Sequence, residues 1–587
     1  KDRLYGVVSG DPSALNFLSD VAPATGRAVV ARLSLDALPP NPLGWEALDV
    51  LILNDVDTTA LSDEQRHALE TWVAHGGHLI VGGGGGAART VAGLAASAMG
   101  SGQRLLPVAV TGLRQVGDLR ALGEEIGATV AAGPFVVAGA DLQEGVALIE
   151  QGDLVLLARR PYGAGRVDFL AFDAGLNPFT RRWDDNTRLW RQIVEIPSTG
   201  ILPFTVNEAY SAQQAVNAIP GLKFLSVLEI LTFMLVYIAL IGPINYLVLR
   251  KFKRRELAWL TIPLIIVGFT AFAYVTGFNI RGGAAIVHRL GIVYVPRGMH
   301  VGRVSEVVGL FSPRRTRYDV QAPGASIRAL ASSDYYAVSA AQGQPLRVVE
   351  DGEGATVTGL RVDVGGIQPF LVEGYVEVPP IEADLRLVGD DTDRLWLDGD
   401  VRCGAVPLKN AVLIVGDNEQ HLGDLDASER VPVRLSFSGT SIGSATWGPT
   451  PPLAPPGLGG GGTPIPVPTS PPMAALYPGG VSNLPERILG PGDYWRDREL
   501  YRRYQFLQAL FPYNAPGSLP PGVFLMGWME ENAPLPVRVV DRPFSETALA
   551  LYVYELPVAE LETGVDILVP PTLIARQVES STSVVDV

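Results

Sequence analysis

Two long apolar segments, separated by a short basic one, place the strongest constraint on the fold of this chain. Residues 224–249 (FLSVLEILTFMLVYIALIGPINYLVL) contain one charged residue, Glu229, and residues 257–280 (LAWLTIPLIIVGFTAFAYVTGFNI) contain none. Each segment exceeds the roughly 20 apolar residues that a helix needs to cross the hydrocarbon core of a bilayer. Because unpaired backbone polar groups are costly in lipid, both segments are predicted to be helices. We therefore expect a two-helix transmembrane hairpin.

The loop between these segments, residues 250–256 (RKFKRRE), predicts the orientation of the hairpin. Its cations are Arg250, Lys251, Lys253, Arg254 and Arg255. The positive-inside rule places such a loop in the cytoplasm. We therefore expect a two-pass protein of the cell membrane, with the large regions on either side of the hairpin outside the cytoplasm. The alternative is a buried helical hairpin in a large soluble protein, although buried helices of this length usually carry charges.

Two polar residues inside the first segment are candidates for a role within the membrane. Glu229 lies about one turn from the start of the predicted helix, where a carboxylate either sits at the membrane interface or acts as an intramembrane functional group. Asn245 is the second polar candidate. The chain starts at Lys1 and no signal peptide is visible, so we expect that a signal or N-terminal anchor was removed or is missing from this numbering.

Charge and cysteine content exclude several functions. A formal net charge of -15 argues against a nucleic-acid-binding protein, which needs a basic face. The single cysteine, Cys403, rules out an intramolecular disulfide and a multi-cysteine metal site, and is predicted to be a buried core residue. The six histidines show no HxxxH or HExxH spacing. Three of them, His67, His75 and His78, cluster around one predicted helix end, where contacts with the helix dipole explain them. We therefore expect no metal site and no cofactor.

Residues 1–197 alternate strand-like and helix-like runs, which predicts an α/β domain with a parallel sheet. The clearest helix is residues 62–77, SDEQRHALETWVAHGG, where Ser62 and Gln65 have the spacing of a capping box. Its predicted apolar face is Ala68, Leu69, Trp72 and Val73. Residues 198–223 are predicted to connect this domain to the hairpin.

A run of five glycines, residues 82–86, follows a predicted strand in HLIVGGGGGAART. A P-loop is excluded because the nearest basic and hydroxyl residues, Arg89 and Thr90, have the wrong spacing. A dinucleotide fingerprint fits only if it is forced, and the next acidic residue, Asp118, is too far away. The glycines retained as candidates for ligand binding are Gly82, Gly84 and Gly86.

Three carboxylates also follow predicted strands of this domain: Asp55, Asp57 and Asp173. Ligands of α/β sheets bind at such strand ends, and three carboxylates there have the chemistry to hold a divalent cation. The alternative is that these aspartates are turn and cap residues, which is the more common role of aspartate at these places.

The segment LDVLILND, followed by LSDEQRHALETWVAHGGHLIVGGGG, resembles the class I glutamine amidotransferase-like family. The resemblance implies an α/β fold in which a turn after a strand presents a catalytic cysteine. The matching turn here is residues 82–86, which contain no cysteine, serine or threonine. Covalent amidotransfer needs a thiolate. We therefore predict the fold without the activity, and a protein that is not an enzyme.

The region after the hairpin is predicted to consist of antiparallel β-sandwich modules. Residues 281–446 contain short alternating runs and frequent turn residues. Residues 447–482 are rich in proline and glycine and are predicted to be a linker, with docking to a proline-binding partner as the alternative. Residues 483–587 are predicted to hold a helix at 494–511 and a final β module. That helix either rests on anionic headgroups or packs on the protein.

The order of these regions resembles that of uncharacterised bacterial envelope proteins. The similarity lies in the hairpin motifs GPINYLVLR and RRELAWLTIP, in GLFSPRRTRYDV and in GAGRVDFLAFDAGLNPF. A looser similarity to auxiliary subunits of gliding-type ABC exporters implies an ABC-type transporter as a candidate partner, beside the lipid bilayer and other envelope subunits. The preferred hypothesis is a non-catalytic, membrane-anchored extracytoplasmic scaffold. The alternatives are a ligand-binding receptor that uses the strand ends and a metal-dependent hydrolase that uses the three aspartates.

Overall fold

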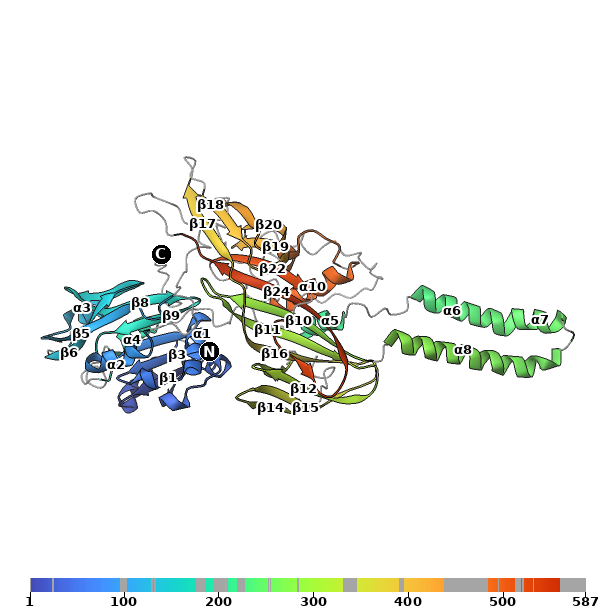
Figure 1. Cartoon of the computed structure of the whole chain (residues 1–587), viewed down its shortest axis with the longest axis horizontal. Helices are drawn as coiled ribbons and strands as arrows, with labels where there is room; N and C mark the ends of the chain where they lie inside the picture. Colours follow the sequence, from blue (N-terminus) through green and yellow to red (C-terminus); the bar gives the residue numbers. More distant parts are fainter. Residues whose placement is uncertain are drawn as a thin grey trace, which may run out of the picture.

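The computed structural model shows three parts: an α/β body, a larger β body, and a pair of long helices that projects from the β body (Figure 1). The residues that the structure describes are 2–23, 26–95, 103–127, 130, 133–175, 186–194, 206, 209–218, 227–251, 253, 255–281, 284–330, 346–389, 395–416, 418–437, 484–494, 496–511, 519, 522–530 and 533–559. The predicted linker, residues 447–482, lies outside them.

The α/β body is built on a mixed sheet with the strand order β2-β1-β3-β4-β9-β8-β7. Its strands are β1 (Arg3–Ser9), β2 (Ala28–Arg32), β3 (Val50–Asn54), β4 (His78–Gly82), β7 (Val146–Gln151), β8 (Leu154–Tyr162) and β9 (Gly165–Leu170). Five of them are parallel, as predicted, whereas β8 and β7 run antiparallel to their neighbours. These two strands are joined by tight turns, and a tight turn can only reverse the chain.

Helical segments cover both faces of this sheet. The helix α1 (Asp63–Ala74) confirms the predicted capping box and packs on one face. There Trp72 meets Trp45 of η3 (Pro42–Trp45) at 5.7 Å between ring centroids. The opposite face is covered by η1 (Pro12–Asp20) and α4 (Asn186–Ile193). A separate two-stranded antiparallel sheet of β5 (Val108–Val116) and β6 (Phe135–Leu142) lies beside the main sheet.

The β body is organised around one eight-stranded sheet, in the order β13-β16-β11-β10-β24-β22-β19-β20. Its strands are β10 (Ala285–Val295), β11 (Val301–Phe311), β13 (Ser326–Ala329), β16 (Ile367–Glu377), β19 (Leu408–Val415), β20 (Asn418–Leu425), β22 (Val523–Glu530) and β24 (Phe544–Leu556). All pairs are antiparallel, as predicted, except that β10 and β24 are parallel. This pair joins regions 281–446 and 483–587 in a single sheet.

Two smaller antiparallel sheets pack on one face of the eight-stranded sheet and enclose the largest apolar core. The first contains β12 (Thr316–Pro323), β14 (Val348–Asp351), β15 (Gly354–Val362) and β23 (Arg538–Val539). The second contains β17 (Glu382–Gly389), β18 (Leu395–Arg402) and β21 (Arg430–Phe437). Cys403 is buried in this core, which confirms its predicted role.

Three helices cover the other face of the eight-stranded sheet: α5 (Ala209–Asn217), α9 (Leu484–Leu489) and α10 (Arg498–Leu510). The helix predicted over residues 494–511 therefore packs on the protein. Its two central arginines are buried: Arg502 donates to His288 Nε2 at 3.1 Å, and Arg503 pairs with Glu530 at 2.8 Å.

The α/β body and the β body meet at a polar joint. Glu46 of the α/β body accepts hydrogen bonds from Arg303 Nε at 2.9 Å and from Tyr375 Oη at 3.1 Å. His75, which caps the C-terminus of α1, is buried there with its ring edge on Tyr375, 5.0 Å between centroids. Met299 and other apolar residues of the β body pack into the α1 side of the α/β core.

The projecting pair consists of a broken helix and a continuous one. The first is α6 (Val227–Ala239), a π-helical turn η6 (Leu240–Ile244) and α7 (Asn245–Lys251); the second is α8 (Ala258–Arg281), which follows η7 (Arg255–Leu257). The π-turn contains Pro243, whose missing N–H cannot join the helical ladder. The two helices lie antiparallel (Figure 1). The rings of Phe233 and Phe269 are in contact between them, with 5.3 Å between ring centroids. A hydrogen bond of 3.0 Å from Thr261 Oγ1 to Asn245 Oδ1 also joins them.

One segment of this pair, Ile230–Lys251, is long and apolar enough to cross a membrane. Within the described residues, α8 contains a shorter apolar stretch, Ala258–Ala273. Residues 224–226 of the predicted first span lie outside the described part of the chain. A helical conformation is thus found for both predicted segments, and the two-pass topology stays a prediction.

Candidate functional site

The predicted site residues lie where β3, β4 and β9 end. The glycine turn at residues 82–86 follows β4, and the strands on either side of β4 lead to Asp55 and Asp173. Both aspartates approach the turn closely. A Cβ atom built on Gly86 would lie 1.7 Å from Asp55 Oδ1, and one built on Gly84 would lie 2.9 Å from the backbone nitrogen of Asp173.

Asp173 is held by a short hydrogen-bond network. Its Oδ1 accepts from Asn54 Nδ2 at 2.6 Å and from the Gly175 backbone N–H at 2.8 Å. Asn54 Oδ1 in turn accepts from the Ala174 backbone N–H at 3.1 Å. Asn54 is not among the residues predicted from the sequence, although its place at the end of an apolar strand (LILN) is a signal for such a role. This network fixes the loop after β9 to the end of β3.

Asp55 combines an unusual backbone with an exposed ion pair. Its φ of 52° lies in the left-handed region, and its Oδ1 accepts from Arg89 Nη2 at 2.8 Å. The side chains are 38% and 64% exposed, respectively, so solvent reaches both charges. The space for the carboxylate exists because residue 86 has no side chain. The glycine run therefore has a packing explanation that does not require a phosphate.

Asp57 has a different role from the other two aspartates. Its Oδ1 caps η4 (Thr58–Ala60) by accepting from the Thr59 backbone N–H at 3.1 Å and from Thr59 Oγ1 at 2.6 Å. The hydrogen bonds of Thr59, from its side chain first and its backbone second, lower the pKa of Asp57. The cap alternative is therefore confirmed for this residue. Within the residues that the structure describes, no three His, Cys, Asp or Glu side chains form a group that could hold a metal ion.

This edge of the sheet offers charges and backbone groups for binding. The turn at residues 82–86 carries no nucleophilic side chain, and Asp55 and Asp173 are engaged with Arg89 and Asn54. The exposed charges of Asp55 and Arg89 can contact a small polar ligand.

Alanine at position 86 is expected to disrupt this edge, whereas alanine at position 85 is not. The new Cβ of Gly86→Ala displaces the Asp55 carboxylate and breaks its ion pair with Arg89; because both side chains are partly exposed and the carboxylate can turn away, the expected loss is up to about 1 kcal/mol. The nearest atom to a Cβ on Gly85 is Val136 Cγ1 at 3.8 Å, an ordinary contact. Urea unfolding of both variants tests this. Equal stabilities of the two variants would contradict the packing explanation.

His78 belongs to a second, buried cluster in the same body. Its Nε2 lies 2.9 Å from Asp168 Oδ2, and Arg159 donates to both Asp168 oxygens at 2.8 and 2.9 Å. Burial lowers the pKa of His78 to about 4. The sequence suggested that His67, His75 and His78 gather at a helix end, where contacts with the helix dipole would explain them. That explanation is wrong for His78, because its ring is held by Asp168 inside the sheet.

The residues predicted to set membrane topology lie at the end of the helix pair that is far from both bodies (Figure 1). Arg250, Lys251 and Lys253 are exposed there. Arg254 and the side chains of Arg255 and Glu229 fall outside the described part of the structure. Asn245 is buried at the contact between the helices, where it accepts from Thr261.

Comparison with known proteins gives a family match for one part of the chain. Residues 399–559, from within β18 to just after β24, match a family described as Domain of unknown function (DUF8725). No curated protein matches the chain.

Several solved structures share a limited similarity. A cytoplasmic protein of Salmonella typhimurium, STM3548, is 13% identical over 33% of this chain and 98% of its own, with a TM-score of 0.26. A second, STM1381 from Salmonella typhimurium LT2, is 15% identical over 33% and 98%, also with a TM-score of 0.26. The exo-beta-1,4-mannosidase Op5Man5 from Opitutaceae bacterium strain TAV5 is 15% identical over 32% and 33%, with a TM-score of 0.20. Similarities at this level carry no functional argument.

Proposed function

We propose that the protein is a non-catalytic, membrane-anchored extracytoplasmic scaffold, an accessory subunit of a bacterial cell-envelope or transporter complex. The observation that carries this proposal is the projecting helix pair, whose large apolar side chains are exposed along much of its length. They include Leu228, Leu231, Leu235, Ile238, Leu247, Trp259, Leu260, Leu264, Val267 and Phe272. Contiguous apolar surface of this extent is rare on soluble monomers and marks a membrane or protein contact.

The polar groups of the helix pair also fit a lipid environment. Thr261 Oγ1 donates to Asn245 Oδ1 across the two helices, as polar side chains do within membranes. The exposed cations at the far end are suited to the cytoplasmic side by the positive-inside rule. In this arrangement both helices cross the bilayer, and both bodies lie outside the cytoplasm.

The non-catalytic part of the proposal rests on the turn at residues 82–86. We infer that this turn is the emptied nucleophile position of an amidotransferase-like domain, because it lacks any thiol or hydroxyl. The extensive β body then serves to bind other subunits, with an ABC-type transporter as the candidate partner. The sequence resemblance to exporter auxiliary subunits supports this choice.

Labelling of single cysteines tests the topology. In a Cys403→Ser background, Asp63→Cys and Arg496→Cys place thiols at side chains that are 85% and 90% exposed on the two bodies. A membrane-impermeant maleimide is expected to label both in intact cells. Lys253→Cys, in the basic loop, is expected to react only after permeabilisation. Labelling of Lys253→Cys alone in intact cells would contradict the proposed orientation.

Copurification tests the scaffold role. The full chain, extracted from native membranes in mild detergent, is expected to bring companion membrane proteins that mass spectrometry identifies. A variant that lacks the helix pair is a control for association through lipid. A monodisperse monomer without companions would argue against a subunit of a complex.

A second candidate function is a receptor that binds a small polar ligand beside Asp55 and Arg89. The observation that favours it is the solvent exposure of this ion pair at the sheet edge. Thermal stabilisation of the full chain by a ligand, lost in Arg89→Gln, would support the receptor, and the absence of any stabilising ligand in broad libraries would count against it.

A further inference from the structure

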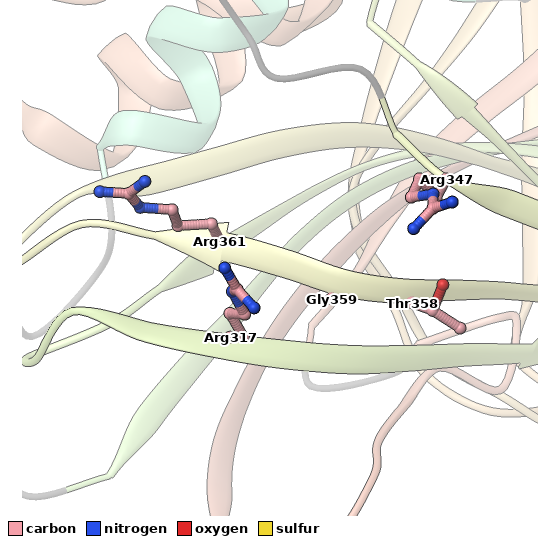
Figure 2. A pocket seen from close by; sticks show the side chains of 5 residues that line it. All are labelled: Arg317, Arg347, Thr358, Gly359 and Arg361. Atoms are coloured by element: carbon pink, nitrogen blue, oxygen red, sulfur yellow. The ribbon is translucent and has the colours of Figure 1, made fainter.

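A hollow lined by three arginines lies on the outer face of the small sheet that contains β12 and β15. It has a volume of about 470 Å³ and is lined by Arg317, Arg347, Thr358, Gly359 and Arg361. We call this site the arginine hollow. Figure 2 shows Arg317 and Arg361 at one end and Arg347 with Thr358 at the other. Such a concentration of positive charge is unusual in a chain with a formal net charge of -15.

A β-bulge shapes the arginine hollow. Between the pairs Tyr318–Leu360 and Val320–Val357, one residue of β12, Asp319, faces two residues of β15. Gly359 takes a φ of +66°, and its N–H donates to Asp319 Oδ1 at 2.6 Å. β-Bulges bend a strand and redirect its side chains, and they are common next to functional sites.

The charges at one end of the arginine hollow are poorly balanced by protein groups. Arg317 and Arg361 are direct cross-strand partners, and their buried neighbours Tyr318 and Leu360 face the core, so both arginines face outward. Like charges in this position destabilise a sheet. Among the described residues, the carboxylate that pairs with Arg361 is a distant one, Asp363 at 3.8 Å, which Arg315 binds more closely at 2.8 Å. Within the described residues, no carboxylate forms an ion pair with Arg317 or Arg347.

A second cross-strand arginine pair shows how the protein balances such charges elsewhere. Arg402 and Arg430 face each other on β18 and β21. Arg402 pairs with Glu382 at 3.3 Å and Arg430 with Asp400 at 3.4 Å. At the arginine hollow, the described residues give Arg317 no such partner and give Arg361 only Asp363, which Arg315 shares. Positive charge therefore remains there for an external anion.

The arginine hollow lies near the place where the helix pair joins the β body. The helix α8 ends at Arg281 and β10 begins at Ala285. The second residue of β10, Ile286, pairs with Phe311 at the end of β11. The next residue, Ser312, is hydrogen bonded through Oγ to Tyr318 Oη at 2.7 Å. Arg317 is the second residue of β12 and therefore lies at the end of that strand nearer the point at which the chain leaves the projecting helices.

We propose that the arginine hollow binds the phosphate groups of anionic lipids in the leaflet next to the β body. The fork of a guanidinium group matches phosphate oxygens in a bidentate manner, and Thr358 adds a hydroxyl donor. A soluble phosphate offers the same chemistry, but the position beside the helix pair selects the lipid headgroup. The proposal rests on the membrane-anchoring part of the proposed function.

Lipid titration of the full chain in neutral detergent tests the site. Native mass spectrometry measures the retention of phosphatidylglycerol, of net-neutral phosphatidylcholine and of inorganic phosphate alone. The test variant is Arg317→Gln/Arg361→Gln, and the matched control is Arg402→Gln/Arg430→Gln. Arginines near an anionic headgroup contribute about fivefold each, so the test variant is expected to bind phosphatidylglycerol about 30-fold more weakly. The control is expected to bind it like the wild type. A single cooperative melting transition, at a temperature close to or above that of the wild type, shows that the variants fold.

Three outcomes would overturn the site. Equal retention of phosphatidylglycerol by the test variant and the wild type removes the arginines from lipid binding. An equal loss of phosphatidylglycerol binding in the control variant shows that the effect comes from the overall charge of the protein. Arginine-dependent binding of inorganic phosphate without phosphatidylglycerol assigns the hollow to a soluble anion. Recovery of the chain in alkaline-washed membranes is measured separately. If neither the wild type nor the two variants are recovered in these membranes, the proposed membrane anchor is wrong. If all three are recovered but show no preference for phosphatidylglycerol, only the proposed lipid site is wrong.

Discussion

Replacement of Asp168 by alanine is expected to destabilise the α/β body by about 3–5 kcal/mol, because it leaves the positive charge of Arg159 without its partner in the interior. Asp168 is fully buried and receives two hydrogen bonds from Arg159, at 2.8 and 2.9 Å, beside one contact of 2.9 Å with His78. Urea unfolding of the full chain, followed by tryptophan fluorescence, measures the loss.

The matched control for this change is an exposed ion pair in the same body. Asp153 pairs with Arg114 at 2.6 Å, but its side chain is 80% exposed. Water screens such a pair, so Asp153→Ala is expected to leave unfolding almost unchanged. Similar losses in the two variants would show that the buried cluster is no more important than a surface contact.

The low pKa of Asp168 is expected to make the protein less stable in strong acid. Burial alone would raise its pKa, but the hydrogen bonds and charges of His78 and Arg159 outweigh burial and lower the pKa to about 2. The folded state therefore holds the proton less tightly than the unfolded chain does. The stabilisation is complete above about pH 4 and disappears as the pH falls to about 2, a change of roughly 2–3 kcal/mol.

Mild acid is expected to loosen the joint between the two bodies through His75. Burial, with a smaller contribution from the charge of Arg303, lowers the pKa of His75 to about 4. Protonation then favours states in which this ring is exposed. The stability of the joint is complete above about pH 6.5 and falls by about 3 kcal/mol as the pH drops to 4. Hydrogen exchange of residues 299–303, corrected for the intrinsic rate at each pH, reports this opening.

The variant His75→Gln isolates this residue from the other buried histidines. Burial also lowers the pKa values of His78 and His288 to about 4, so they contribute acid sensitivity in both proteins. We expect His75→Gln to keep the protection of residues 299–303 down to lower pH than the wild type. His67→Gln, at the partly exposed side of α1, is the control. Identical pH profiles for the wild type and His75→Gln would exclude His75 as the sensitive group.

Local features of the fold were predictable from the sequence. The capping box of Ser62 and Gln65, together with an apolar face at helical spacing, predicted α1, because both signals lie within a dozen residues. The helical conformation of the projecting segments follows in the same way from their apolar length. These features depend on neighbours along the chain, which a sequence displays directly.

Features that depend on distant pairing were not predictable. The parallel pairing of β10 with β24 joins residues about 260 positions apart, as in Ala285 and Phe544, and no local pattern specifies it. The arginine hollow arises from the strand register that places Arg317 opposite Arg361. A bulge then changes this register between Tyr318 and Val320. The packing of Asp55 over Gly86 explains the glycine run, but it becomes visible only when the order of the strands in the sheet is known.

The place of β24 in the middle of the large sheet has a consequence for biosynthesis. While a ribosome is still producing the chain, β10 is ready as soon as the helix pair is complete, yet its neighbour on one side is made some 250 residues later. Until Phe544–Leu556 has been synthesised, β10 and β22 each have an unpaired edge, and unpaired edges can form a sheet with other chains. Maturation of this half of the molecule must therefore wait for the late strand, and a holding chaperone would be useful during that interval.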